Sequence, residues 1–297
     1  MPLKRSQGLS LSILAAYAYG MTLSERNTLF KGEIGIASVV LIGVGIMAFS
    51  IMPVYPWVLA EMTRRSPGIF QSLGAYFFQP SPYVPVVSMI CAMLYACITM
   101  VIIYRYFEKT YSPEILYIAL FVLSFALEGS RIMVPLKLKY ALPSVYLIMA
   151  SRMLLFGRYV GILSLFVASV YAAGLKVQKQ SIMIWIIIFC TLMITQGVPI
   201  DGLAWDSSFC MISGYPGMFR ILEGGMALIT VVSFGISAYY RGTKEYIFIG
   251  IGSLLAMAGR NMLLRADTWI SPFPGLAILG IGTWFICTYL HRVYLWL

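Results

Sequence analysis

The chain has 297 residues, of which 60% are hydrophobic and only 11% are charged, and its mean hydropathy is +0.87. A soluble globular domain carries about 25% charged residues and about half apolar ones. The composition therefore excludes an ordinary soluble protein and predicts an all-α polytopic membrane protein, a helix bundle with short loops. No polar stretch is long enough to form a separate soluble domain.

The formal net charge of +10 fits lysines and arginines in the loops of a membrane protein. Binding of nucleic acid is not expected, because no clustered basic run with interleaved aromatic residues occurs. The five cysteines show no metal-ligand or disulfide spacing, and the single histidine is His291. We therefore expect no metal site, no cofactor and no catalytic triad, and the sequence indicates no catalytic residue.

Two regions near the start do not read as regular spans. Residues 1–33 are predicted to be a cytoplasmic or interfacial lead-in, with a short span at 8–23 as the alternative, and 34–297 to be the transmembrane helical domain. Residues 61–82 contain two arginines and three prolines among aromatic residues, which favours an interfacial segment.

About 20 apolar residues are needed to cross a bilayer as a helix. By this criterion the chain contains eight candidate spans, which are 34–56, 84–106, 113–134, 143–175, 181–198, 218–240, 246–264 and 274–294. The fourth is long enough to be either one protruding helix or two pieces broken near Gly157. A polar loop, 199–216, follows the fifth span, and we expect it to be solvated.

The distribution of lysine and arginine predicts the orientation in the membrane. With one helix in the fourth segment and both termini in the cytoplasm, eleven of the 21 basic residues lie inside, five lie outside and five arginines lie within spans. If the fourth segment is divided into two spans, nine basic residues lie inside and seven lie outside, so the two sides differ less. The sequence therefore favours a single long helix and a location in the cytoplasmic membrane.

The same topology brings polar residues of four spans to one height, in the outer third of the membrane. The predicted ligand-binding residues are Glu128, Arg131, Arg152, Arg158, Arg220, Glu223, Arg260 and Asn261. Charges at that depth are costly unless they face one another or a water-filled cavity. Five arginines against two glutamates leave an excess of three positive charges, which predicts an anionic ligand or lipid head group.

Two points about these residues stay open at this level. Glu128 with Arg131, and Arg220 with Glu223, are spaced for pairing within one helix, but pairing between helices is equally compatible. The arginines can also be purely structural, or extend to lipid phosphates. Besides the bilayer, a protein partner in the membrane or cytoplasm is expected, because no output domain follows the eighth span.

Three functions fit this pattern. The first is a membrane-embedded binding or sensory protein with a cationic outer cavity for an anion. The second is a small secondary transporter of an anionic solute. The third is a membrane enzyme that acts on lipid-linked phosphate.

Small residues form two further patterns within the spans. Gly224–Gly225, and the series Gly252, Ala256 and Gly259, are predicted to permit close contact between helices.

Overall fold

The computed structural model describes residues 23–51, 81, 83–110, 112–174 and 180–295. This part contains eight helical segments that are long and apolar enough to cross a membrane. They are α2 (Leu23–Ile51), α5 (Tyr83–Phe107), α6 (Pro113–Leu123) continued by η2 (Ser124–Ile132) and α7 (Met133–Tyr140), α8 (Ser144–Ala172), α9 (Gln180–Gly197), α10 (Pro216–Arg241), α11 (Glu245–Leu264) and α12 (Pro272–Leu295). The prediction of an all-α transmembrane bundle with eight spans is confirmed.

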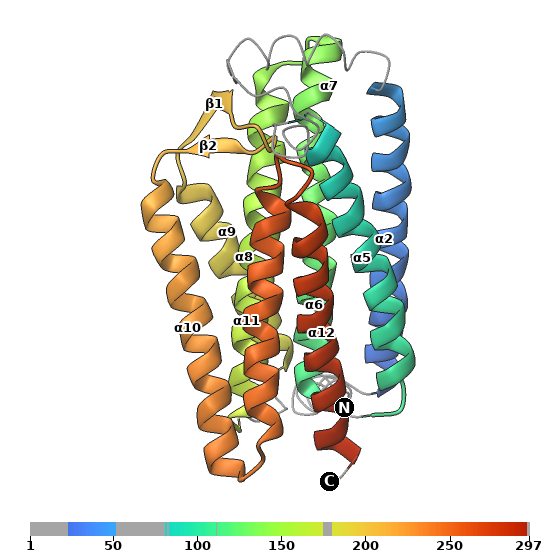
Figure 1. Cartoon of the computed structure of the whole chain (residues 1–297), viewed down its shortest axis with the longest axis vertical. Helices are drawn as coiled ribbons and strands as arrows, with labels where there is room; N and C mark the ends of the chain where they lie inside the picture. Colours follow the sequence, from blue (N-terminus) through green and yellow to red (C-terminus); the bar gives the residue numbers. More distant parts are fainter. Residues whose placement is uncertain (1–22, 52–80, 82, 111, 175–179, 296–297) are drawn as a thin grey trace, which may run out of the picture.

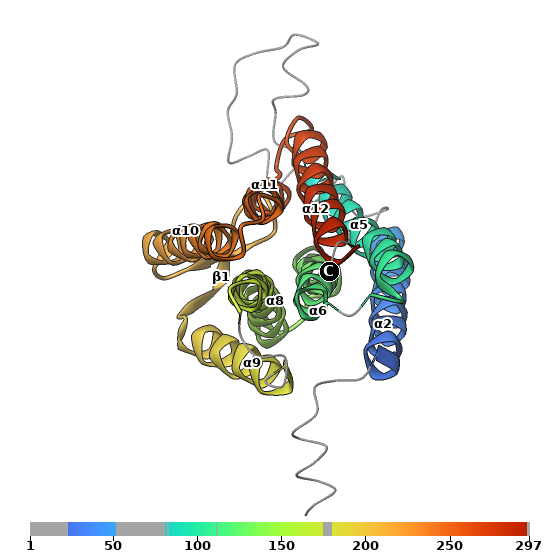
Figure 2. The same ribbon diagram turned by 90° about the horizontal axis from the view of Figure 1, so that it is seen from below.

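The helices run along the long axis of the molecule (Figure 1), and the end view shows α6 and α8 at the centre of the bundle (Figure 2). The third and fourth spans are accordingly the most buried, whereas α2, α9 and α10 are the least buried. Exposed apolar faces are expected where helices meet lipid. The two central helices are therefore the elements around which the buried charges are organised.

The first helix begins at Leu23, so eleven residues of the predicted lead-in belong to it. Its start is fixed by Arg26, whose Nη1 and Nη2 donate to the carbonyls of Thr110 and Phe107 at 2.5 Å. Residues 1–22, and nearly all of the predicted interfacial segment 61–82, lie outside the described residues. The division into two regions therefore stays a prediction.

The fourth span is one continuous helix, as the orientation argument favoured. Helix α8 has 29 residues and spans about 43 Å at 1.5 Å per residue. No break occurs at Gly157, whose missing side chain instead makes room for η2. A Cβ at Gly157 would lie 2.8 Å from the Cβ of Leu127 and 3.0 Å from the carbonyl of Ser124.

The third span differs from the uninterrupted helix that its apolar sequence predicts. Nine residues, Ser124–Ile132, form the 3₁₀ helix η2, although such runs rarely exceed four residues. A 3₁₀ helix rises about 2.0 Å per residue against 1.5 Å, so the span is lengthened by about 4 Å. Within it, the hydroxyl of Ser124 donates to the carbonyl of Phe121 at 2.6 Å. The break coincides with the charged residues of this span.

The polar loop 199–216 contains an antiparallel hairpin, β1 (Ile200–Trp205) and β2 (Met211–Ser213), and thus differs from the predicted solvated loop. Its turn is closed by Asp206, whose Oδ1 accepts from the amides of Ser208 at 3.0 Å and Cys210 at 2.9 Å. Phe209 in this turn has φ of 60° and is buried. The hairpin lies at one end of the bundle (Figure 1).

The two patterns of small residues have different outcomes. A Cβ at Gly252 would lie 2.7 Å from the carbonyl of Gly282, so α11 and α12 are in close contact there, as predicted. A Cβ at Gly224 or Gly225 would meet nothing within 4 Å. The prediction of a helix contact is therefore wrong for that pair, because α10 turns this face away from its neighbours.

Candidate functional site

The deepest charged pair joins the third and seventh spans. Nε of Arg260 on α11 lies 3.1 Å from Oε1 of Glu128 on η2, and the two side chains are 3% and 1% exposed. Nη1 of Arg260 also donates to the hydroxyl of Ser124 at 3.0 Å. The guanidinium lies 4.6 Å from the centroid of the Phe125 ring, a cation–π contact. The guanidinium is therefore held by three residues within two turns of η2.

A second pair joins the fourth and sixth spans. Nε of Arg158 on α8 lies 2.6 Å from Oε1 of Glu223 on α10. Nη2 of Arg158 donates to Oε2 of Glu223 at 2.6 Å and to Oδ1 of Asn261 at 3.0 Å. Because Asn261 follows Arg260 in α11, the two ion pairs are adjacent. Both carboxylates thus pair between helices, which decides one of the alternatives that the sequence left open.

The depth of this group differs between helices. Arg158 is the 15th of the 29 residues of α8, and Glu128 is the 16th of the 28 residues of the third span. Glu223 is the 8th of the 26 residues of α10, and Arg260 is the 16th of the 20 of α11. Glu223 and Arg260 lie in the terminal third of their helices, whereas in the two central spans the charges lie halfway along the helix. Which end of the bundle faces outward stays a prediction.

Two of the predicted residues point elsewhere. Arg131 is buried and donates from Nε and Nη2 to the carbonyl of Ser208, at 3.1 and 2.6 Å, so it fastens the hairpin turn to η2. Arg152 donates from Nη1 to Oε1 of Gln196 on α9. Neither side chain belongs to the group formed by the two ion pairs, because each is rotated toward a different neighbour.

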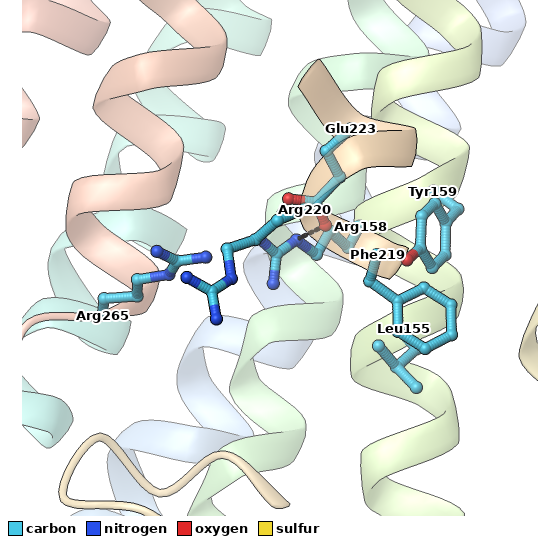
Figure 3. A pocket seen from close by; sticks show the side chains of 7 residues that line it. All are labelled: Leu155, Arg158, Tyr159, Phe219, Arg220, Glu223 and Arg265. Atoms are coloured by element: carbon cyan, nitrogen blue, oxygen red, sulfur yellow. Dashed lines mark hydrogen bonds and ion pairs between the residues drawn. The ribbon is translucent and has the colours of Figure 1, made fainter. Parts of the chain in front are cut away.

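The remaining predicted residue, Arg220, lines a pocket of about 350 Å³ together with Arg158, Glu223 and Arg265. We call this cavity the arginine pocket. In Figure 3 the guanidiniums of Arg158, Arg220 and Arg265 lie near one another. Arg265 was not among the predicted residues, because its position directly after α11 places it in a loop. Its nearness in sequence to Arg260 was the available signal.

The other wall of the arginine pocket is apolar. It consists of Leu155, Tyr159 and Phe219, and the ring centroids of Tyr159 and Phe219 are 6.1 Å apart. A second pocket of about 90 Å³ shares Leu155 and Arg158 with it and extends to Ile200 and Cys210 beneath the hairpin. The cavity therefore combines cationic and apolar surfaces, which is suited to an anion that carries an apolar group.

Several polar atoms around these pairs are buried without a hydrogen-bond partner. They are Oε2 of Glu128, Nη2 of Arg260, Nη1 of Arg131, the hydroxyl of Ser130 and the hydroxyl of Tyr159. Buried polar groups normally have a partner in the protein, in water or in a ligand. Among the residues that the structure describes, no three histidine, cysteine or acidic side chains are grouped to hold a metal ion.

The bundle and its buried charges define a multi-pass helical membrane protein with a cationic pocket lined by two of its spans and by the residue directly after a third. No protein-family model matches the chain. The chain is similar to an uncharacterized protein of Treponema pallidum (strain Nichols), with 21% identity over 296 residues. That similarity takes in 82% of this chain and 84% of the other protein. It leaves the activity unassigned.

Proposed function

We propose that this multi-pass protein binds a small anionic ligand in the arginine pocket, as a binding or sensory protein of the cytoplasmic membrane. The observation that carries the proposal is the convergence of three guanidiniums on one cavity against a single carboxylate. Arginine stays protonated at neutral pH, so like charges gathered in this way repel one another. A bound anion removes that repulsion.

The structural alternative accounts for part of the charge. The buried pair Glu128–Arg260 does not line the arginine pocket and is suited to holding η2 against α11. Arg158 is also paired, but its pair is more exposed and borders the pocket. We therefore propose that the Glu128–Arg260 pair is structural and that the Arg158–Glu223 pair forms the base of a binding site.

Purified protein in neutral detergent tests the proposal. Sodium phosphate and sodium citrate, each compared with sodium chloride at equal ionic strength, should raise the apparent melting temperature. A ligand at 100 times its Kd adds about 2.7 kcal/mol to stability. Arg265→Gln should abolish the stabilisation, and Arg292→Gln, which removes an exposed arginine at the opposite end of the bundle, should retain it. Equal responses of the two variants would exclude the arginine pocket as the binding site.

The orientation is part of the same proposal, with both termini in the cytoplasm and the hairpin outside. Ser207, in the hairpin turn, and Lys244, between α10 and α11, are exposed at opposite ends of the bundle. In intact cells, with the native Cys210 of the same turn replaced by serine, a membrane-impermeant maleimide should label Ser207→Cys and not Lys244→Cys. Labelling of Lys244→Cys alone would invert the topology. A sensory role further requires a protein partner, which the same cells would yield by crosslinking.

Transport of an anionic solute is the second candidate, favoured by the interruption of the third span. Transporters place discontinuous helices and charged residues near the middle of the membrane, and η2 carries Glu128 halfway along its span. Proteoliposomes loaded with labelled phosphate distinguish the two functions. A binding or sensory protein retains the label, whereas a transporter releases it at a rate that Glu128→Gln reduces.

A further inference from the structure

We infer that the anion in the arginine pocket is a phosphate monoester with an apolar substituent, and that the hydroxyl of Tyr159 donates to one of its oxygens. This inference rests on the proposed function and names the class of ligand. It follows from the directions of the donors, from one unpartnered hydroxyl and from the apolar wall of the same pocket.

The donors approach the cavity from three elements. Arg158 extends from α8, Arg220 from the start of α10, and Arg265 from the residue directly after α11 (Figure 3). A guanidinium has five N–H donors, so a partner elsewhere does not exhaust it. One guanidinium fork satisfies the two coplanar oxygens of a carboxylate. Three guanidiniums from different directions, with N–H groups of Arg158 left over beyond those that pair with Glu223, instead match the three terminal oxygens of a phosphate monoester.

Tyr159 supplies the second, independent observation. The residue is only 2% exposed, lines the arginine pocket, and has a hydroxyl without a hydrogen-bond partner among the described residues. A buried hydroxyl that lacks a partner is unfavourable. A phosphate oxygen is a strong acceptor, so a ligand of this class would satisfy the hydroxyl.

The apolar wall indicates what the phosphate carries. Leu155 and the ring of Phe219 stand beside Tyr159 in the same cavity (Figure 3). An inorganic phosphate would leave this surface in contact with water, whereas an aryl or alkyl substituent would cover it. The head group of phosphatidic acid and a soluble aromatic phosphate share this chemistry, and they are separated below by experiment.

Isothermal titration of the full chain in neutral detergent tests the class of ligand. Phenyl phosphate should bind about tenfold more tightly than benzoate, which offers the same ring with a carboxylate. Tyr159→Phe should weaken phenyl phosphate by about tenfold, the effect of one hydrogen bond to a charged group, without lowering the melting temperature. Arg292→Gln is the matched control and should bind both compounds as the unmodified chain does.

The outcomes separate this inference from the proposed function. Equal affinity for benzoate and phenyl phosphate would overturn the phosphate class and leave anion binding intact. An unchanged affinity in Tyr159→Phe would overturn the assignment of its hydroxyl. Failure of both compounds and of inorganic phosphate to bind would overturn the proposed function itself. Displacement of phenyl phosphate by phosphatidic acid, but not by phosphatidylglycerol, supports a lipid monoester, and the absence of displacement by either lipid supports a soluble one.

Discussion

Removal of the charge on Glu128 is the most direct test of how the bundle is held together. Glu128→Gln keeps the shape of the side chain and an oxygen that accepts from Arg260, but it removes the negative charge. The guanidinium of Arg260, 3% exposed, would then remain buried without a counter-charge. Loss of one partner of a buried ion pair costs about 3–5 kcal/mol of stability. Because the glutamine oxygen still accepts from Arg260, we expect the cost of Glu128→Gln to lie near the lower end of this range.

A destabilisation of about 3 kcal/mol lowers the melting temperature by about 6–12 °C in a chain of this size. Thermal melts in detergent measure the shift, with Glu108→Gln as the control, because Glu108 is exposed. The double variant Glu128→Gln with Arg260→Gln should lose less than the sum of the single variants, since it leaves no unpaired charge. A melting temperature within about 2 °C of the unmodified chain would refute the reasoning, because the carboxylate would then be hydrated already.

Three further predictions follow from other parts of the molecule. Arg158→Ala should also lower the melting temperature, but by less than Glu128→Gln, because its pair is more exposed; an equal or larger loss would contradict this. Gly157→Ala should cost about 1–3 kcal/mol by forcing η2 away from α8, whereas Gly224→Ala, with open space around it, should be neutral or stabilising in the same melts. Burial raises the pKa of the Cys210 thiol above its ordinary value. Its labelling by maleimide should therefore continue to accelerate at pH values where Ser207→Cys has reached its maximum, and coincident pH profiles would show that the thiol is exposed.

The sequence predicted which charged residues share a level better than it predicted their partners. Glu128, Arg158, Glu223, Arg260 and Asn261 do come together, in two adjacent ion pairs. The pairs are formed between helices, and neither follows the spacing of three residues that suggested pairing within one helix. Position along a span can be read from the chain, but the direction in which a side chain points depends on the rotation of its helix against neighbours.

The same limit applies to Arg131, Arg152 and Arg265. Arg131 contacts the hairpin turn and Arg152 contacts α9, while Arg265 enters the pocket from beyond the end of its helix. All three are basic residues within a span or directly after one, and nothing in their local sequence distinguishes a residue that lines a cavity from one that contacts a loop. Their roles depend on which segments lie beside them in space.

Composition and apolar run length by themselves determined that this chain is a membrane bundle of eight spans with costly charges inside it, because about 20 apolar residues are needed for each crossing. The tertiary structure alone decided that the third span changes to a 3₁₀ helix where Arg260 meets it, and that Tyr159 and three arginines line one cavity. Those features arise from contacts between segments far apart in the chain, where the packing of one helix fixes the backbone and side-chain directions of the next.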